Sequence, residues 1–219
     1  MKKIIASIIF LLATLDCIVN GKLHCKLPQP DIPRDWITMV DPCTKKLSDQ
    51  IQQELTASIT YMAMGAHFSR DTINRPGFAE FFFKSANEER EHAIKLIDYL
   101  LMRGGLTQDI SKLIKDPKPV WTSWESGYKA LKDALVLETH VTNKIRDIII
   151  TCESPAPNEK GEVFNDYHLV DYLTGEFLEE QHKGQRELAG MASVLGKMME
   201  HHGNIGEFLF DKKLLNHEL

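Results

Sequence analysis

Acidic side chains recur on otherwise apolar helical faces of this 219-residue chain, where they could bind a metal ion. On a helical wheel of about 100° per residue, Glu89 and His92 fall within the apolar stripe of one segment, one turn apart. Glu54 and Tyr61 lie on the edge of the stripe in a second segment, and Glu138 lies in the middle of a third. A charged group on such a face costs free energy unless it is paired or metal-bound. Together these residues predict a metal site.

Two further polar residues extend this set. Gln181 lies on the stripe of a fourth segment, and Glu88 lies near the border of the stripe that holds Glu89. Oxygen-rich ligands with one imidazole suit iron or manganese better than a closed, sulfur-rich zinc site. Tyr61 could donate a hydrogen bond to the site or supply an electron.

The ligands can be divided between two ions. Glu89 is expected to bridge them, with Glu54 and His92 on the first ion and Glu138 and Gln181 flanking the second. Two adjacent ferrous ions can together give two electrons to dioxygen, which a single ion cannot do without releasing a radical. The pattern therefore predicts oxidation of ferrous iron at a di-iron carboxylate site.

A second Glu-x-x-His pair, Glu179 and His182, would make the site symmetric if it also faced inward. With Gln181 on the apolar stripe, however, the wheel places both residues on the outer face of the same segment. We interpret them as surface or subunit-contact residues.

Helical periodicity predicts the elements that position these residues. Glycines and prolines separate the periodic segments, and the link at about 104–121 is far longer than the short turn between the first and second helices. At up to about 3.3 Å per residue, it can run the length of a roughly 42 Å helix, so the second and third helices can be parallel. We predict an all-α four-helix bundle with one long crossover and a short fifth helix. The expected helices cover residues 45–70, 77–103, 122–151, 164–199 and 204 to about 215.

The first residues have the pattern of a secretory signal peptide, which we expect to be residues 1–21. Lys2 and Lys3 precede an apolar run at 4–15, which is too short to span a bilayer. No membrane anchor is expected after its removal. The formal net charge of −5, with no basic and aromatic patch, argues against nucleic acid as a partner.

The proline-rich stretch 22–43 is expected to be an extended arm, followed by the di-iron domain at 44–219. Once Cys17 leaves with the signal peptide, Cys25, Cys43 and Cys152 remain. We expect Cys25 and Cys43 to lie outside the bundle, one or both in a disulfide. Because three is odd, either one thiol is free or one cysteine pairs with another chain, and we favour a bond to a partner chain.

Four stretches resemble the signatures of ferritin heavy chains: ELTASITY at 54–61, NEEREH at 87–92, ALVLE at 134–138 and EFLFDK at 207–212. The resemblance extends from about Thr44 to Leu215. It implies iron storage and detoxification, with ferrous iron oxidised and ferric oxyhydroxide deposited in a 24-subunit cage. The ferroxidase residues of the family carry over to Glu54, Tyr61, Glu88, Glu89, His92, Glu138 and Gln181.

The signal peptide, the cysteine-bearing arm and an insertion near 152–166 resemble insect-type secreted ferritin heavy-chain homologues. Those assemble with a light-chain homologue. The resemblance further implies that Asp171 lines a three-fold channel, with Thr174 where a second acid is usual. It also makes Glu91 a nucleating residue, with Ile94 at a position that is often polar, so the light chain is expected to do more of the nucleation.

Two alternatives have different consequences. A stand-alone di-iron oxidase would need a cavity for an organic substrate, and a non-catalytic cage subunit would not need its intact carboxylates. The destination is the secretory pathway, either outside the cell or in the lumen of the ER or Golgi. The final NHEL loosely resembles an ER-retention tetrapeptide.

Overall fold

The regular structure of this chain is helical throughout the residues that the computed structural model describes, which are 31–39, 41–105, 110–154, 157 and 165–218. Residues 31–35 are exposed and belong to a separate unit. The helices of the second unit are α2 (Asp41–Ser69), α3 (Pro76–Met102), α4 (Ile110–Leu113), α5 (Gly127–Glu153), α6 (Tyr167–Tyr172), the π-helix η1 (Leu173–Leu178), α7 (Glu179–His202) and α8 (Asn204–Leu215).

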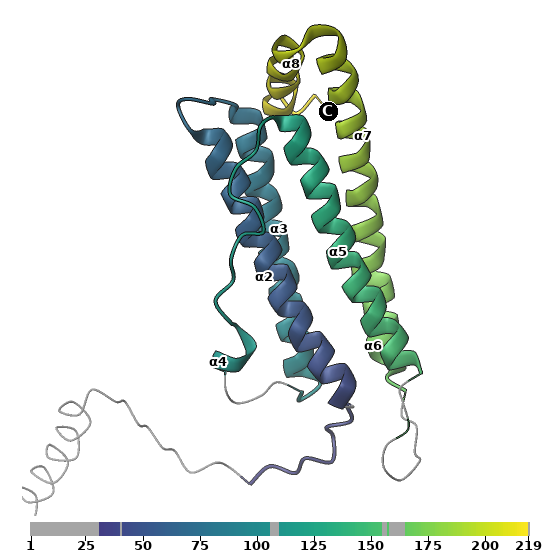
Figure 1. Ribbon diagram of the computed structural model, residues 1–219. Coiled ribbons are helices and arrows are strands. Elements are labelled where there is room, and N and C mark those ends of the chain that lie inside the picture. The colour runs from purple at the N-terminus through teal and green to yellow at the C-terminus, as the bar shows by residue number, and fades with distance from the viewer. Residues whose placement is uncertain (1–30, 40, 106–109, 155–156, 158–164, 219) are drawn as a thin grey trace, which may run out of the picture. The chain divides into compact units, whose positions relative to one another are not determined.

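Four long helical rods form the bundle, and the crossover has the predicted connectivity. Helix α3 returns antiparallel to α2, and the segment that holds α4 then runs back along the bundle, so that α5 starts at the same end as α3 (Figure 1). Helices α3 and α5 are therefore parallel. The rod formed by α6, η1 and α7 completes the bundle, and α8 lies across the end where α7 finishes.

Local capping sets the helix boundaries that differ from the sequence prediction. The third long helix was expected from residue 122, but it begins at Gly127 because the Ser126 side chain caps it and accepts from the Lys129 backbone N–H. Trp124 lies ahead of the helix and is nevertheless buried. The crossover is also not wholly extended, since it contains the short helix α4.

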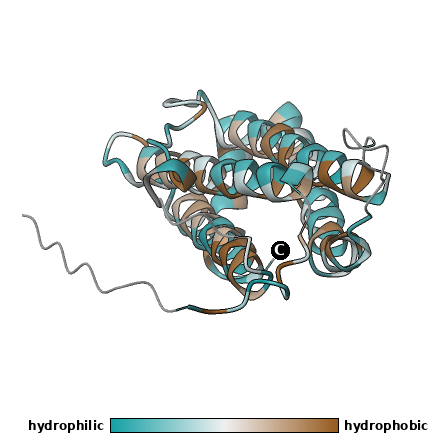
Figure 2. Ribbon diagram, turned by 90° about the horizontal axis from the view of Figure 1, so that it is seen from below, coloured by the Kyte–Doolittle hydropathy of each residue, from teal (hydrophilic) through white to brown (hydrophobic). Residues whose placement is uncertain are grey.

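The apolar faces of the helices meet between the rods, and Figure 2 shows that each long helix carries both hydrophilic and hydrophobic positions. Stacked aromatic rings fill one end, with Phe78 packed against Phe68 and Phe210 at centroid distances of 5.2 and 5.7 Å. Although the neighbouring Tyr61 is buried, Met62 of α2 is 49% exposed. The stripe of a long helix drifts around its axis, because 3.6 residues per turn do not divide seven evenly. Near this point of α2, the buried stripe includes Tyr61 and leaves Met62 exposed.

Helix α8 is joined to the bundle by two acidic side chains. Asp211 Oδ1 accepts from the backbone N–H of Phe78, the third residue of α3, at 3.1 Å. Glu207 Oε2 accepts from the backbone N–H of Gly127, the first residue of α5, at 2.9 Å. Both carboxylates therefore satisfy backbone donors at helix N-termini, where negative charge is also favoured by the helix dipole.

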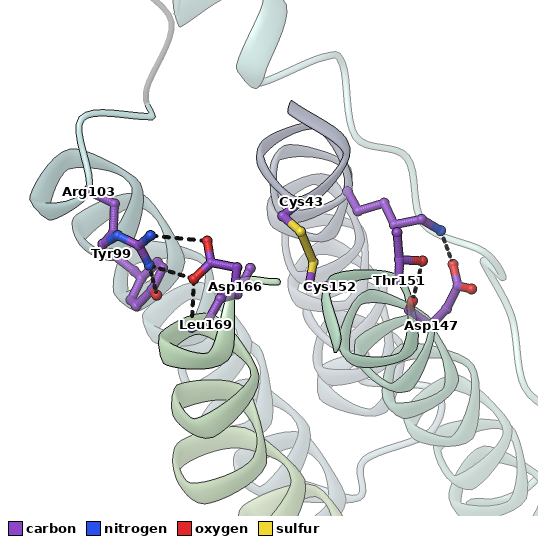
Figure 3. The surroundings of a disulfide bond; sticks show 9 residues. Cys43, Tyr99, Arg103, Asp147, Thr151, Cys152, Asp166 and Leu169 are labelled. Atoms are coloured by element: carbon purple, nitrogen blue, oxygen red, sulfur yellow. Dashed lines mark hydrogen bonds and ion pairs between the residues drawn. A yellow bond between two sulfur atoms is a disulfide. The ribbon is translucent and has the colours of Figure 1, made fainter. Parts of the chain in front are cut away.

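The prediction that Cys43 lies in the arm is wrong. Cys43 is in the first turn of α2 and forms a disulfide with Cys152 of α5, 109 residues away (Figure 3). Pro42 does not keep this stretch out of the helix, because proline is tolerated in the first turn, and α2 starts at Asp41. Cys25 lies outside the described residues.

In the described part of the chain, no helix is both long enough and apolar enough to cross a membrane.

Candidate metal centre

Three buried side chains from α2 and α3 converge in the middle of the bundle. Glu54, Glu89 and His92 are 0, 4 and 6% exposed, and one ligand atom from each lies within 4.8 Å of the other two. The pairing of α2 with α3 brings them together, and Ser58 Oγ donates to the Ala86 carbonyl across that contact at 2.6 Å. The sequence predicted each of these three residues.

Several polar atoms of this cluster have no hydrogen-bond partner among the described residues. They are Glu54 Oε2, Glu89 Oε2 and His92 Nδ1. Glu54 Oε1 accepts from Gln50 Nε2 at 2.8 Å, so the second oxygen of this carboxylate is the one without a partner. Buried polar groups are normally satisfied, and a cation held between these three side chains would compensate for the missing partners. The donor set of two carboxylates and one imidazole fits iron.

Side chains from α5 and α7 lie beside this cluster. Tyr61 donates its hydroxyl to Glu138 Oε1 at 2.5 Å, and Thr142 donates to Gln181 Oε1 at 2.8 Å. Glu138 and Gln181 are both buried. Both line the cavity that Glu89 and His92 also line, so the structure brings the two predicted halves of the site together.

Burial raises the pKa of the three buried carboxyl groups in the centre. The pKa of Glu54 lies well above its usual value because of burial and then the neighbouring charge of Glu89. Burial and the charge of Glu138 likewise raise the pKa of Glu89. For Glu138, burial raises the pKa to about 7, although the Tyr61 hydrogen bond opposes the shift. Burial also raises the pKa of Tyr61. Each of these shifts favours the protonated form of its group.

The cavity beside the centre has a volume of about 130 Å³ and lies between α3 and α7. Glu88 lines it, with a side chain that is 49% exposed and paired to Lys84 at 3.5 Å. Glu180 also lines it, and its Oε2 is 3.4 Å from His92 Nε2 and 3.6 Å from Lys95 Nζ. These carboxylates connect the centre to solvent.

Sequence reasoning missed two residues that contact this centre, Glu180 and Gln50. Glu180 lies roughly 60° from the middle of its stripe on a wheel of 100° per residue, so a search of stripe borders would have found it as it found Glu88. Gln50 lies one turn before Glu54 and is 1% exposed. An amide on the apolar face next to a predicted ligand was the available signal.

Other predicted residues lie away from the centre. Asp171 is exposed on α6, and Glu91 is exposed on α3. Glu179 and His182 are exposed as well, which confirms their expected position on the outer face. The fourth helix is not one uninterrupted α-helix, since η1 precedes Gln181, and π-helical turns are frequent near functional sites.

Comparisons with known proteins agree with this architecture. A family model described as a ferritin-like domain matches residues 44–198. The chain is 56% identical to a ferritin heavy chain of Papilio xuthus over the full length of both, and 53% identical to a ferritin heavy chain of Drosophila melanogaster over 98% of this chain and 100% of that one. The crystal structure of Trichoplusia ni secreted ferritin superposes with a TM-score of 0.81 at 56% identity, covering 88% of this chain and 98% of that one.

Proposed function

Because this chain belongs to the ferritin family, whose members store iron, we propose that it is a ferroxidase subunit that oxidises ferrous iron with dioxygen. The observation that carries this proposal is the set of three buried atoms without partners, Glu54 Oε2, Glu89 Oε2 and His92 Nδ1. A bundle with a purely structural role would be more stable with apolar residues at these positions, because buried carboxylates without partners cost free energy.

Ferrous iron is the substrate. Glu54 and His92 hold the first ion, Glu89 is shared, and Glu138 and Gln181 hold the second. Tyr61 fixes the Glu138 carboxylate through its hydroxyl. The raised pKa values of the carboxyl groups mean that binding of the cations displaces protons, which leave through the cavity lined by Glu88 and Glu180. Each ion supplies one electron, so the pair delivers two electrons to one dioxygen molecule.

The size of the cavity favours this substrate over an organic one. A volume of about 130 Å³ accommodates ions, water and dioxygen, whereas sites for organic ligands usually measure about 300–1,000 Å³. This argues against the stand-alone di-iron oxidase. The intact carboxylates argue against a subunit that is purely structural.

The wider assembly follows from the family relationship. We infer a 24-subunit cage shared with a light-chain homologue, in which Asp171 lines a three-fold channel and Glu91 helps ferric oxyhydroxide to nucleate. The name of the Trichoplusia ni protein, a secreted ferritin, supports processing of residues 1–21 and a secretory destination. We propose the same for this chain.

The decisive experiment compares initial dioxygen consumption by assembled cages at matched protein and ferrous concentrations. Glu89→Ala removes the ligand shared by both ions, so rapid oxidation should nearly vanish. His182→Ala changes an exposed residue of α7 and should leave the rate almost unchanged. A wild-type rate in Glu89→Ala, or a collapse in His182→Ala, would contradict the assignment.

A further inference from the structure

Gln50 has no role in the chemistry described so far, yet it contacts the metal centre directly. It lies on α2 four residues before Glu54, so both side chains project from the same face of one rigid helix. Its Nε2 donates to Glu54 Oε1 at 2.8 Å. This bond occupies one carboxylate oxygen and leaves Oε2, which has no partner among the described residues, for the cluster with Glu89 and His92.

The side chain of Gln50 is shielded from solvent and lines a cavity. It is 1% exposed and lines the inner wall of a second cavity, of about 360 Å³, between α2, α4 and α5. None of the residues that line this cavity also lines the cavity beside Glu88 and Glu180. Gln50 therefore stands between the metal centre and the opposite side of the bundle.

The buried position of the Gln50 amide is unfavourable for the stability of the fold. Its carbonyl oxygen, Oε1, is buried and has no hydrogen-bond partner in the described structure. A buried amide that satisfies only its donor is less favourable than an apolar side chain of similar size, because the unsatisfied acceptor has lost its water. If Gln50 served only to fill space, leucine would serve better.

We propose that Gln50 is a positioning residue that holds the Glu54 carboxylate so that it binds iron through Oε2 alone. This inference rests on the proposed function, since it needs Glu54 to be a ligand. Hydrogen bonds that orient metal ligands typically account for about 10–100-fold in metal affinity. Without the Gln50 donor, Glu54 can rotate or offer both oxygens, which changes the geometry of the bound ion.

The test uses Co²⁺, a redox-inert probe with a visible absorption spectrum that reports its geometry, titrated into assembled, iron-free cages. Gln50→Leu and Gln50→Met both remove the donor and keep the volume. The matched control is Gln53→Leu, which makes the same change to a half-buried residue of the same cavity wall. Glu54→Gln identifies the part of the Co²⁺ signal that belongs to this centre.

Both Gln50 variants should melt at or above the wild-type temperature, bind Co²⁺ at this centre about 10-fold or more weakly, and give an altered spectrum. Gln53→Leu should match wild type. Wild-type affinity in the Gln50 variants, or an equal loss in Gln53→Leu, overturns the positioning role but leaves the proposed function standing. If wild-type cages show no Co²⁺ signal that Glu54→Gln removes, both proposals fall. If neither Gln50 variant folds, Gln50 serves folding and the positioning role is rejected.

Discussion

The carboxyl groups of the centre show how one side chain can be unfavourable for folding and useful for binding. Glu54, Glu89 and Glu138 are each almost wholly buried, and burial raises the pKa of each. In the iron-free protein, these groups must either hold a proton or remain charged in a poorly solvated site. Binding of a cation removes that conflict, so the free energy of binding is coupled to proton release.

The unfavourable burial of an ionised carboxyl group should be measurable at Glu138, whose pKa is raised to about 7, as a pH dependence of stability. As the pH rises from about 4.5 to 7, the unfolded chain releases this proton while the folded chain keeps it, so the free energy of unfolding falls. For this shift the fall is up to about 3 kcal/mol. Glu138→Gln cannot titrate and can still accept from Tyr61. Iron-free wild-type protein should therefore lose more thermal stability between pH 5 and 8 than the Glu138→Gln variant. If the melting temperatures of the two proteins change with pH in parallel, the pKa of Glu138 is not raised.

At the scale of the elements, the disulfide and the acidic side chains of α8 fix opposite ends of the bundle. Cys43 ties the start of α2 to the end of α5, near the Arg103–Asp166 ion pair at 2.9 Å (Figure 3). Asp211 and Glu207 fix the N-termini of α3 and α5 at the end where α8 lies. The candidate metal centre lies in the middle of the long helices, away from the helix ends, which fray most easily.

Removal of the disulfide should cost a large part of the stability. In the chain-entropy model, a link across 109 residues stabilises the fold by about 4–5 kcal/mol. The double variant Cys43→Ser, Cys152→Ser should therefore melt well below wild type when both are iron-free. Adding a reductant should lower wild type to the level of the variant and leave the variant unchanged. If oxidised wild type and the variant unfold together, the pairing does not exist in solution.

At the scale of the whole molecule, the proposed cage would bring exposed acidic side chains of several subunits together and so attract iron. Three copies of the exposed Asp171 would converge at a three-fold axis and create a local potential that concentrates ferrous ions. Asp171→Asn should slow oxidation at low ferrous concentration, with rates converging on wild type at high concentration and the cage intact. Asp116→Asn, which removes an exposed acid from the crossover, is the control. Equal rates at low ferrous concentration would place the route of iron elsewhere.

The cysteine that remains once Cys43 and Cys152 are paired also concerns the whole assembly. If residues 1–21 are removed, Cys25 is the remaining cysteine of the processed chain. An odd cysteine in an oxidising compartment favours a bond to a partner chain. Non-reducing electrophoresis of secreted cages should show a covalent dimer that Cys25→Ser abolishes. A monomer band alone would count heavily against the interchain bond.

The sequence by itself determined the helices, the crossover and most of the centre, because these depend on local periodicity. Each stripe needs only its own helix to be recognised, and a charged residue such as Glu89 or Glu138 stands out on it. Tertiary packing decided which distant groups meet. Cys43 pairs with Cys152 because α2 starts early and packs beside α5, and Glu180 approaches His92 because α7 lies against α3. A wheel describes one helix and contains no information about its neighbour, so the contact of Glu180 with His92 became visible only in the folded bundle.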